Sequence, residues 1–389
     1  MRWGQISGSK ESLNETCLAI QTAMKKTMIS SVEDRVRTGI ITRLGEGPGL
    51  GDRTLIPHQL DENGSRSVFF HHKQFSDLAR LCNLKRSKGL SVSVGIPTLN
   101  EETRIGKTIS VIKQAFVDRL GLVDEVVVID SGSTDRTAEE AEKSGARVHV
   151  AHQILPEVAP VRGKGENLWK SLHVLGGDIL VWVDADIQNF HSGFISGLVG
   201  PLLEDDALLY ATAFYRRPLQ LSPSQSSLNG GRVTELLVRP FLSHLLPEIC
   251  EFRQPMAGEH AARRSLLQVL PFFSGYAVDV GHLIDITRIM GKQVIAQVDL
   301  DERVHRHREL TDLSAQSFGV LQALMKRAED WGRISVHECY SQLKCRFGEV
   351  RGSEPTGVEM VEVERPPMAT VPGYAKCRAN HLRTSRKNL

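Results

Sequence analysis

The sequence predicts an α/β fold with one Rossmann-like parallel sheet. Short apolar runs that suit buried strands recur between residue 90 and about residue 190. Each run ends in a polar loop, and in most units a helical pattern follows the loop. Strands that alternate with helices form parallel sheets with right-handed crossovers, and ligands bind at the carboxyl ends of such strands. This pattern is typical of a nucleotide-binding half-domain.

The strands and helices follow one another in a regular order. The first unit is "LSVSVGIPTLNEE" with the helix "RIGKTISVIKQAF", and the second is "VDEVVVIDSGSTDRTAEEAEKSG". A third strand, "GARVHVA", precedes the helix "GKGENLWKSLHVLGGD" and the strand "ILVWV". Farther along we expect a strand in "ALLYATAFYRRP", a helix in "GGRVTELLVRPFLSHLL" and a strand in "VIAQVDLDERVHRHR". Residues 311–348 are predicted to be helical.

This order divides the chain into four parts. Residues 1–71 form an N-terminal extension to which we assign no role, and residues 72–207 carry the alternating units. Residues 208–348 hold the mixed elements and the C-terminal helices. Residues 349–389 combine the Pro-rich "GSEPTGVEMVEVERPPMATVPG" with a basic end, which predicts a flexible tail.

The composition excludes several classes of protein. With 41% hydrophobic and 24% charged residues, the chain of 389 residues has the make-up of a soluble globular protein. We find no apolar run of the about 20 residues that span a membrane and no signal peptide, so we expect a cytoplasmic protein without a membrane partner. The net charge of +2 argues against a nucleic-acid partner, and six scattered cysteines argue against a disulfide scaffold or a structural zinc site.

Neither of the two commonest phosphate-binding motifs occurs in the sequence. The segment "RGKGEN" has no Gly five residues before Gly163 and no Ser or Thr after Lys164, so it is not a Walker A loop. The glycines between residues 45 and 51 miss the spacing G-x-G-x-x-G and follow no predicted strand. A P-loop NTPase and a dinucleotide dehydrogenase are therefore not predicted.

A pair of carboxylates follows the strand "ILVWV". Side chains alternate along an extended backbone, so Asp184 and Asp186 point the same way and can share one cation. Mg²⁺ and Mn²⁺ take such oxygen ligands and usually share them with substrate phosphates. An acidic strand end that faces water is the alternative. The two strand–loop–helix units that come earlier in the chain favour the metal.

Five segments in this order and spacing resemble the GT-A glycosyltransferases of family 81, the glucosyl- and mannosyl-3-phosphoglycerate synthases. The segments are "SVGIPTLNEE", "VVVIDSGSTDRT", "GKGENLW", "GDILVWVDADI" and "GGRVTELLVRP", and the similarity runs from about residue 72 to residue 330. The resemblance implies a GT-A fold in which a nucleotide-sugar-binding half, residues 72–207, merges with an acceptor-binding half, residues 208–348. It also implies a homodimer.

The resemblance implies a role for individual residues on the donor side. Lys164 supplies a compact charge for the diphosphate, and Asp279 contacts the sugar. Asp184 and Asp186 hold Mg²⁺ or Mn²⁺, and His305 is implied as a third metal ligand. The expected catalytic set consists of Asp184, Asp186, Lys164 and Asp279. The expected donor-binding set is Pro97, Thr98, Leu99, Glu101, Ser131, Lys164, Asp184, Ala185, Asp186, Met256, Tyr276, Asp279, Arg303 and Arg308.

On the acceptor side the implied residues are Gly231, Arg232, Thr234 and His307. Glycines that open a helix expose backbone N–H groups, and with an arginine and a hydroxyl they form a cradle for a phosphate or carboxylate. The alternative for this cradle is a glycine-capped helix with a solvated arginine. The alternative for Lys164 is an ordinary surface lysine, and the alternative for His305 is a solvated basic residue. His307 stands where the glucosyl members commonly have Asn, and Asp279 where they commonly have Glu, which leaves the preferred donor and acceptor open.

The expected reaction is the transfer of a hexose from a nucleoside-diphosphate sugar, with UDP-glucose favoured, to the 2-hydroxyl of 3-phospho-D-glycerate. The product would be glucosyl-3-phosphoglycerate, a precursor of compatible solutes or polysaccharides. The family retains the anomeric configuration, so we expect neither Glu259 nor Asp279 to act as the base that inversion would require.

Three other functions compete with this expectation. A GDP-mannose-dependent mannosyl-3-phosphoglycerate synthase shares every motif named above. A sugar nucleotidyltransferase normally has a Gly-rich basic loop after its first strand, and "IPTLNEE" is not such a loop. A non-catalytic nucleotide-sugar-binding module would leave the acceptor cradle without a purpose.

Overall fold

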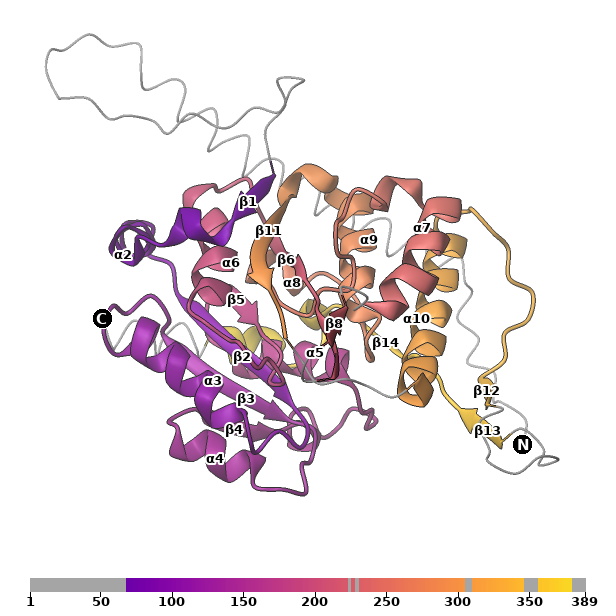
Figure 1. Ribbon diagram of the computed structural model, residues 1–389, viewed down its shortest axis with the longest axis horizontal. Helices are drawn as coiled ribbons and strands as arrows, with labels where there is room; N and C mark the ends of the chain where they lie inside the picture. Colours follow the sequence, from indigo (N-terminus) through magenta and orange to yellow (C-terminus); the bar gives the residue numbers. More distant parts are fainter. Residues whose placement is uncertain (1–67, 223–224, 228–230, 305–309, 346–355, 380–389) are drawn as a thin grey trace, which may run out of the picture. The chain divides into compact units, whose positions relative to one another are not determined.

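An eight-stranded sheet forms the centre of the computed structural model, which describes residues 68–222, 225–227, 231–304, 310–345 and 356–379 (Figure 1). Neighbouring strands of this sheet are parallel except at β9, which is antiparallel to both β5 and β6. The α/β class is therefore confirmed, as is the parallel pairing expected for the strands between residues 90 and 190; the antiparallel strand comes from later in the chain. In spatial order the strands are β1 (Phe69–His71), β11 (Ile295–Glu302), β6 (Tyr210–Arg216), β9 (His260–Arg263), β5 (Ile179–Trp182), β2 (Val92–Thr98), β3 (Glu125–Asp130) and β4 (Arg147–Val150).

Helices cover both faces of the sheet, which explains why its strands are continuous apolar runs. Alternate residues of β3 enter different hydrophobic clusters: Val126 and Val128 join one, and Val127 and Ile129 join the other. The first cluster includes residues of α2 (Leu78–Ser87), α3 (Ile105–Ile112), α4 (Thr137–Lys143) and α6 (Gly193–Glu204). The second includes residues of α5 (Lys164–Val174), α7 (Arg239–Leu245), α8 (Arg264–Leu267), α9 (Val278–Met290) and α10 (Leu310–Asp330).

The reversed direction of β9 has a direct consequence for the site. Because β9 runs against β5, Trp182 near the carboxyl end of β5 pairs with His260 at the start of β9. The residues that enter β9, Gly258 and Glu259, therefore lie beside the residues that leave β5. A stretch from the second half of the chain is thus brought against Asp184 and Asp186.

Most predicted helices are confirmed, but the last one ends early. α10 ends at Asp330, where the Arg333 N–H donates to the Ala328 carbonyl (2.8 Å) and Gly332 has a φ of 69°. This is the Schellman termination that glycine favours. The predicted continuation to residue 348 is wrong, because β12 (Gln342–Cys345) pairs there with β13 (Thr356–Glu359). The sequence pattern did not predict α6 or α9.

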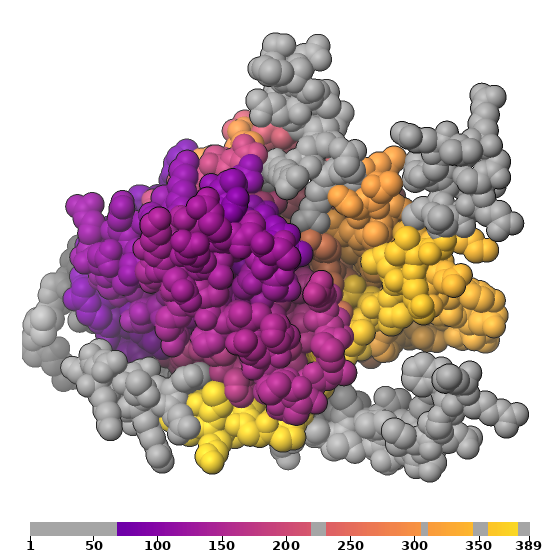
Figure 2. All heavy atoms as spheres, turned by 90° about the horizontal axis from the view of Figure 1, so that it is seen from below, coloured from indigo at the N-terminus to yellow at the C-terminus, as the bar shows by residue number. Residues whose placement is uncertain are grey.

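The C-terminal segment differs from the flexible tail that the sequence predicted, because residues 364–374 pack on the core. β14 (Glu364–Arg365) pairs with β10 (Phe272–Phe273), and Arg365 donates to both carboxylate oxygens of the fully buried Glu166, at 2.7 and 3.0 Å. Met368 and Tyr374 are buried, and in Figure 2 this yellow segment lies against magenta and orange parts of the chain. The apolar residues among its prolines provide the contacts. The basic end, residues 380–389, lies outside the described residues.

The remaining elements are short. They are the strands β7 (Leu219–Ser222) and β8 (Gln225–Ser227), the 3-10 turns η1 (His72–Phe75), η3 (Ala151–Gln153), η5 (Pro247–Ile249), η6 (Lys292–Val294) and η7 (Met368–Thr370), and the π-helical turns η2 (Lys113–Val117) and η4 (Thr234–Val238). Of the helices in the described part of the chain, none combines the length and the apolar character that a membrane span needs.

Candidate active site

Two loops at the carboxyl ends of β2 and β3 hold each other through hydrogen bonds from backbone N–H groups to side-chain oxygens. Asn100 has a left-handed φ of 56°; its Oδ1 accepts from the Thr134 N–H at 2.9 Å, and its own N–H donates to Ser133 Oγ at 2.9 Å. The Glu101 N–H donates to Thr137 Oγ1 at 2.7 Å. The two loops therefore form one preorganised unit. This unit contains five of the predicted donor-binding residues, namely Pro97, Thr98, Leu99, Glu101 and Ser131.

The side chains of these five residues differ in what they offer a ligand. Thr98 is buried and its hydroxyl donates to Asp130 at 3.2 Å, so its side chain supports the loop. Leu99 is 52% exposed, an apolar surface at the end of a strand. Ser131 Oγ accepts from Asn167 Nδ2 at 2.8 Å, and Asn167 also donates to the Ile129 carbonyl. The sequence analysis missed Asn167, which links α5 to this loop.

A cluster of buried charges lies at the carboxyl end of β5. Lys164 Nζ is 3.1 Å from Asp184 Oδ1 and 3.2 Å from Asp279 Oδ2, and it donates to the Gly258 carbonyl. Arg303 Nη2 is 2.9 Å from an oxygen of Asp184 and 2.9 Å from an oxygen of Asp186. The structure therefore brings together five predicted site residues from four separate segments. Ala185 lies buried between the two aspartates.

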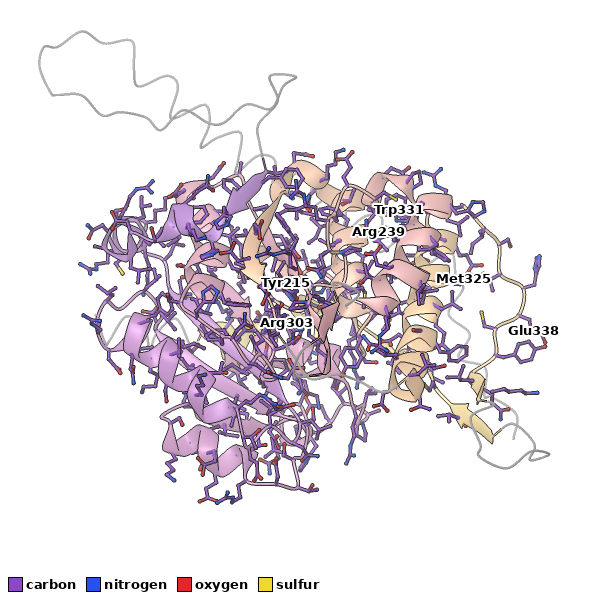
Figure 3. All side chains as sticks on the ribbon, viewed as in Figure 1. Tyr215, Arg239, Arg303, Met325, Trp331 and Glu338 are labelled. Atoms are coloured by element: carbon purple, nitrogen blue, oxygen red, sulfur yellow. The ribbon has the colours of Figure 1, made fainter. Side chains whose placement is uncertain are left out.

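The sequence analysis missed the inner half of this cluster. Arg303 Nε is 2.9 Å from Glu259, which is fully buried and accepts from the Tyr215 hydroxyl at 2.5 Å. Arg217 donates to the same hydroxyl at 3.0 Å and to the Met256 carbonyl at 3.3 Å. Figure 3 shows Tyr215 and Arg303 close together, and the guanidinium lies 5.8 Å from the ring centroid. The segment "AGEHA" provided no spacing signal that could have placed Glu259 here.

The charges of the cluster set the protonation of its members. Burial lowers the pKa of Lys164, but Asp184, Asp279 and Glu259 more than offset this effect, so the pKa is raised and the ammonium stays charged. Lys164 is shared between Asp184 and Asp279, so it offsets the burial of Asp279 only in part. Burial accordingly raises the pKa of Asp279 to about 7, although Lys164 opposes the shift. Burial also lowers the pKa of His260 well below its usual range. Nδ1 of this histidine is 3.9 Å from Asp279.

The raised pKa of Asp279 predicts that the metal-free chain loses stability as the pH rises towards 7. An unfolded aspartate has a pKa of about 3.9, so between about pH 4 and pH 7 the folded chain binds more protons than the unfolded chain. A folded state that binds more protons is destabilised by rising pH. Asp285, with a pKa raised to about 6 by burial, acts in the same direction. The decline in melting temperature over this range, measured in the presence of a chelator, should therefore be shallower in Asp279→Asn, and an unchanged slope would contradict the assignment.

Gly258 is needed where it stands, because a side chain would collide with the cluster. A Cβ at this position would lie 2.2 Å from Asp184 Oδ2 and 2.7 Å from Lys164 Nζ. We expect Gly258→Ala to displace Asp184 and to lower kcat/KM by about 10²-fold, the cost of a misplacement of about 1 Å in an active site. The matched control is Gly176→Ala, whose new Cβ would meet its nearest atom at 3.5 Å. Circular dichroism should show that both variants fold; equal activity of the two would contradict the prediction.

Tyr276 follows a loop that anchors the start of α5. The Gly165 N–H donates to the Gly275 carbonyl at 3.1 Å, and the Glu166 N–H donates to the Ser274 carbonyl at 2.8 Å. A Cβ at Gly165 would lie 1.8 Å from the Phe273 carbonyl oxygen, so only glycine permits this approach. These bonds fix the helix start from which Lys164 reaches the cluster.

The predicted acceptor residues lie around the π-helical turn η4. Gly231 has a left-handed φ of 83°, and Thr234 is buried at the start of the turn. A Cβ at Gly231 would lie 4.0 Å from Arg217, which belongs to the inner half of the charge cluster. Arg232 is partly buried beside it. The predicted residues His305, His307 and Arg308 lie outside the described residues.

The two carboxylates that follow β5 fit a hard divalent cation. Asp184 and Asp186 present carboxylate oxygens, which Mg²⁺ and Mn²⁺ prefer, and their side chains are 24% and 17% exposed. Arg303 contacts one oxygen of each aspartate, which keeps both carboxylates directed to the same place. The residues described therefore fit a Mg²⁺ or Mn²⁺ site.

Several known proteins are similar to this chain in both sequence and fold. A model of the family described as "Glycosyl transferase family 2" matches residues 93–267. The glucosyl-3-phosphoglycerate synthase of Petrotoga mobilis is 43% identical over 309 residues, which cover 78% of this chain and 94% of the relative. The enzyme of that name from Mycobacterium tuberculosis is 50% identical over 243 residues, which cover 61% of this chain and 74% of the relative.

Crystal structures of the Mycobacterium tuberculosis protein are similar over most of their length. One, in complex with Mn²⁺, UDP-glucose and phosphoglyceric acid, has a TM-score of 0.66 and 40% identity, and the match covers 75% of this chain and 94% of that chain. Another, with Mg²⁺ and UDP, has a TM-score of 0.65 at the same identity and coverage. With a relative 43% identical over nearly its whole length, the chain belongs to the glucosyl-3-phosphoglycerate synthase family, whose fold is GT-A.

Proposed function

We propose that this protein transfers glucose from UDP-glucose to 3-phosphoglycerate in a reaction that depends on Mg²⁺ or Mn²⁺. The observation that carries the proposal is the cluster of Lys164, Asp184, Asp186 and Arg303 at the carboxyl end of β5. It is supported by a solved relative, 40% identical, that binds Mn²⁺, UDP-glucose and phosphoglyceric acid.

The residues of the cluster have distinct roles in the proposed reaction. Lys164 neutralises the diphosphate that leaves, which is where most charge develops. Asp184 and Asp186, with His305 expected beside them, hold the divalent cation, which when bound supplies further positive charge to the diphosphate. Arg303 orients both aspartates and is itself held by Glu259. Asp279 accepts hydrogen bonds from sugar hydroxyls.

We also propose that the reaction retains the anomeric configuration. Inversion would need a carboxylate base beside the acceptor hydroxyl. Glu259 cannot serve, because it is fully buried and bound by Tyr215 and Arg303. Asp279 is 3.2 Å from Lys164 and is assigned to the sugar. Attack on the same face, assisted by the leaving phosphate oxygen, needs neither residue as a base.

The acceptor would be held between η4 and the donor site. For a phosphate or carboxylate, the partly buried Arg232 offers a charge and the Thr234 side chain offers a hydroxyl. The turn that follows Gly231 offers backbone N–H groups. The proposed site therefore places the acceptor beside Arg217 and the charge cluster. His307 belongs to the expected acceptor set on the family resemblance.

Product analysis tests the proposal and its rivals together. The chain is incubated with UDP-glucose and GDP-mannose in competition, with 3-phosphoglycerate and with Mg²⁺ or Mn²⁺, and the products are identified by mass spectrometry. We expect glucosyl-3-phosphoglycerate. A mannosyl product would favour the mannosyl-3-phosphoglycerate synthase, UDP binding without transfer would favour a non-catalytic module, and formation of a nucleotide sugar from a sugar phosphate would favour a nucleotidyltransferase. A homodimer and a cytoplasmic location stay predictions, which size-exclusion chromatography and cell fractionation would test.

A further inference from the structure

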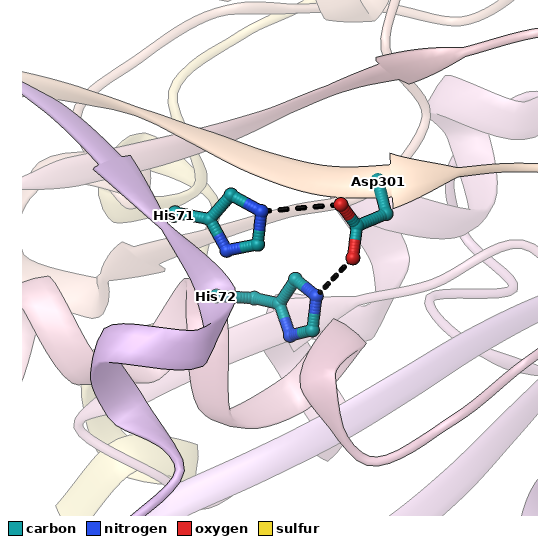
Figure 4. A group of neighbouring side chains, drawn as sticks. All are labelled: His71, His72 and Asp301. Atoms are coloured by element: carbon teal, nitrogen blue, oxygen red, sulfur yellow. Dashed lines mark hydrogen bonds and ion pairs between the residues drawn. The ribbon is translucent and has the colours of Figure 1, made fainter.

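A second cluster of ionisable side chains lies at the edge of the sheet, where β1 meets β11. His71 ends β1, His72 begins η1, and Asp301 lies near the end of β11, 230 residues after His71 (Figure 4). His71 Nε2 is 3.1 Å from Asp301 Oδ1, and His72 Nε2 is 2.9 Å from Asp301 Oδ2. One possible ligand atom from each of these three residues lies within 4.8 Å of the other two. In the part of the chain that the structure describes, no other group of three His, Cys, Asp or Glu side chains is arranged in this way.

We propose that His71, His72 and Asp301 bind a transition-metal ion of the Zn²⁺ type. Two imidazoles and a carboxylate are a donor set that suits Zn²⁺ and Co²⁺, whereas Mg²⁺ prefers oxygen ligands alone. In a tetrahedral site with metal–ligand distances of about 2.0–2.1 Å, neighbouring ligand atoms are about 3.3 Å apart. His71 lies 3.1 Å from one oxygen of Asp301 and His72 lies 2.9 Å from the other, and one ligand atom from each residue lies within 4.8 Å of the others, so a modest approach of the side chains gives this spacing. The fourth position would be taken by water.

The structure holds these ligands in place before any ion binds. Asp301 has a φ of 66°, in the left-handed region that non-glycine residues rarely adopt, and its N–H donates to Asp299 at 2.9 Å. The His72 ring packs on α6 at two glycines: a Cβ at Gly193 would lie 2.4 Å from His72 Nδ1, and a Cβ at Gly197 would lie 2.8 Å from His72 Cβ. A backbone conformation that costs energy and a ring fitted against glycines are features of a built site.

Four present contacts would change when an ion binds, because the two His–Asp301 hydrogen bonds would be replaced by bonds to the ion. The Lys73 ammonium, 3.1 Å from Asp301 Oδ2, would move into solvent, where 70% of its side chain already lies. The Lys73 N–H donates to His71 Nδ1 over a long 3.2 Å, and this bond would be given up because that nitrogen must then carry the proton. In each neutral ring the Nε2 proton would move, by way of solvent, to Nδ1, so the ring stays neutral when Nε2 binds the ion. Asp301, which takes part in most of these contacts, is 39% exposed, and each change is confined to the four side chains and backbone of this cluster.

The position of the site indicates what the ion would do. Arg303, which orients both aspartates of the active site, follows Asp301 by two residues. The register of β11 against β6 shifts between Asp299 and Glu302, so the ladder with β6 leaves out Asp301. An ion bound to β1 and β11 would fix the stretch and, through it, Arg303. The site is separate from the proposed Mg²⁺ or Mn²⁺ site, and the inference does not rest on the proposed function.

The test measures binding of Zn²⁺ and Co²⁺ to the full-length chain without an affinity tag, after removal of metals with a chelator. We expect Zn²⁺ to raise the melting temperature, and Co²⁺ to give the visible absorption of a tetrahedral site. Both effects should persist in Asp186→Asn, which removes a ligand of the active-site cation, and in His152→Ala, which removes an exposed histidine elsewhere. Both should be lost in His72→Gln and Asp301→Asn, with affinity lower by at least about tenfold.

The variants are chosen so that the result is unambiguous. His72→Gln keeps a side chain that can donate to Asp301, so a lower melting temperature without metal would not by itself count as support. The proposal requires that the rise caused by Zn²⁺ disappear. An equal rise in the parent chain and in His72→Gln, or no Zn²⁺ effect on the parent chain, would overturn it and leave the cluster as a set of hydrogen bonds and ion pairs.

Discussion

Replacement of Lys164 by methionine will lower kcat/KM by about 10² to 10³-fold, the usual cost of removing one group aimed at developing charge. Lys164 is the buried cation that contacts both Asp184 and Asp279, at 3.1 and 3.2 Å, and it stays charged because three carboxylates surround it. Methionine keeps most of the length of the side chain and removes its charge. Steady-state kinetics with UDP-glucose and 3-phosphoglycerate measure the effect.

The control for this substitution is Lys143→Met, at the end of α4, where 72% of the lysine side chain is exposed. It should leave kcat/KM within about twofold, since surface substitutions are usually close to neutral. Loss of activity in Lys164→Met should appear mainly in kcat, because leaving-group charge is greater in the transition state than in the bound substrate. A change confined to KM would show that Lys164 binds the donor but does not assist departure of the diphosphate.

Replacement of Arg303 by methionine will destabilise the fold and abolish most activity. The guanidinium is 4% exposed and contacts Asp184, Asp186 and Glu259, each at 2.9 Å. Removing one partner of a buried ion pair costs about 3–5 kcal/mol, because a buried charge is left without compensation. Urea denaturation should show this loss, whereas Arg288→Met, at an exposed position of α9, should not.

A double variant separates the two effects of Arg303. Glu259→Gln removes the innermost carboxylate, so Arg303→Met with Glu259→Gln should recover part of the lost free energy of unfolding. It should not recover activity, because Asp184 and Asp186 would still lack the group that orients them. A double variant as unstable as Arg303→Met alone would show that the Glu259 charge is not what destabilises the single variant.

The local pattern of the sequence predicted the first half of the fold well. β2, β3 and β5 are apolar runs, and each is followed by a polar loop whose position the pattern also indicated. The pair Asp184 and Asp186 was predicted from the alternation of side chains in a strand, but β5 ends at Trp182, and the contacts of both aspartates with Arg303 direct them to the same place. Lys164 and Asp279, which lie far apart in the sequence, were assigned through the family resemblance, and the structure brings both to the same cluster.

The inner part of the site could not be predicted in this way. Glu259 meets Arg303 because β9 enters the sheet antiparallel, and periodicity does not report the direction in which a strand pairs. The hydroxyl of Tyr215, which reads as an ordinary strand residue, completes this arrangement. The C-terminal segment was taken for a tail because prolines dominate its pattern, whereas its burial depends on Glu166, about 200 residues earlier.

The sequence by itself determined the α/β class, the polar loops at the strand ends and the carboxylate pair that follows β5. These features depend on the spacing of apolar residues and on the polar residues that follow each apolar run, which are local properties of the chain. Only the tertiary structure decided which charges meet: Lys164 and Arg303 on the aspartates, Glu259 behind them, and His71 and His72 on Asp301. Pairing between distant segments follows from sheet order and strand direction, which burial of the whole core selects and no single stretch of sequence encodes.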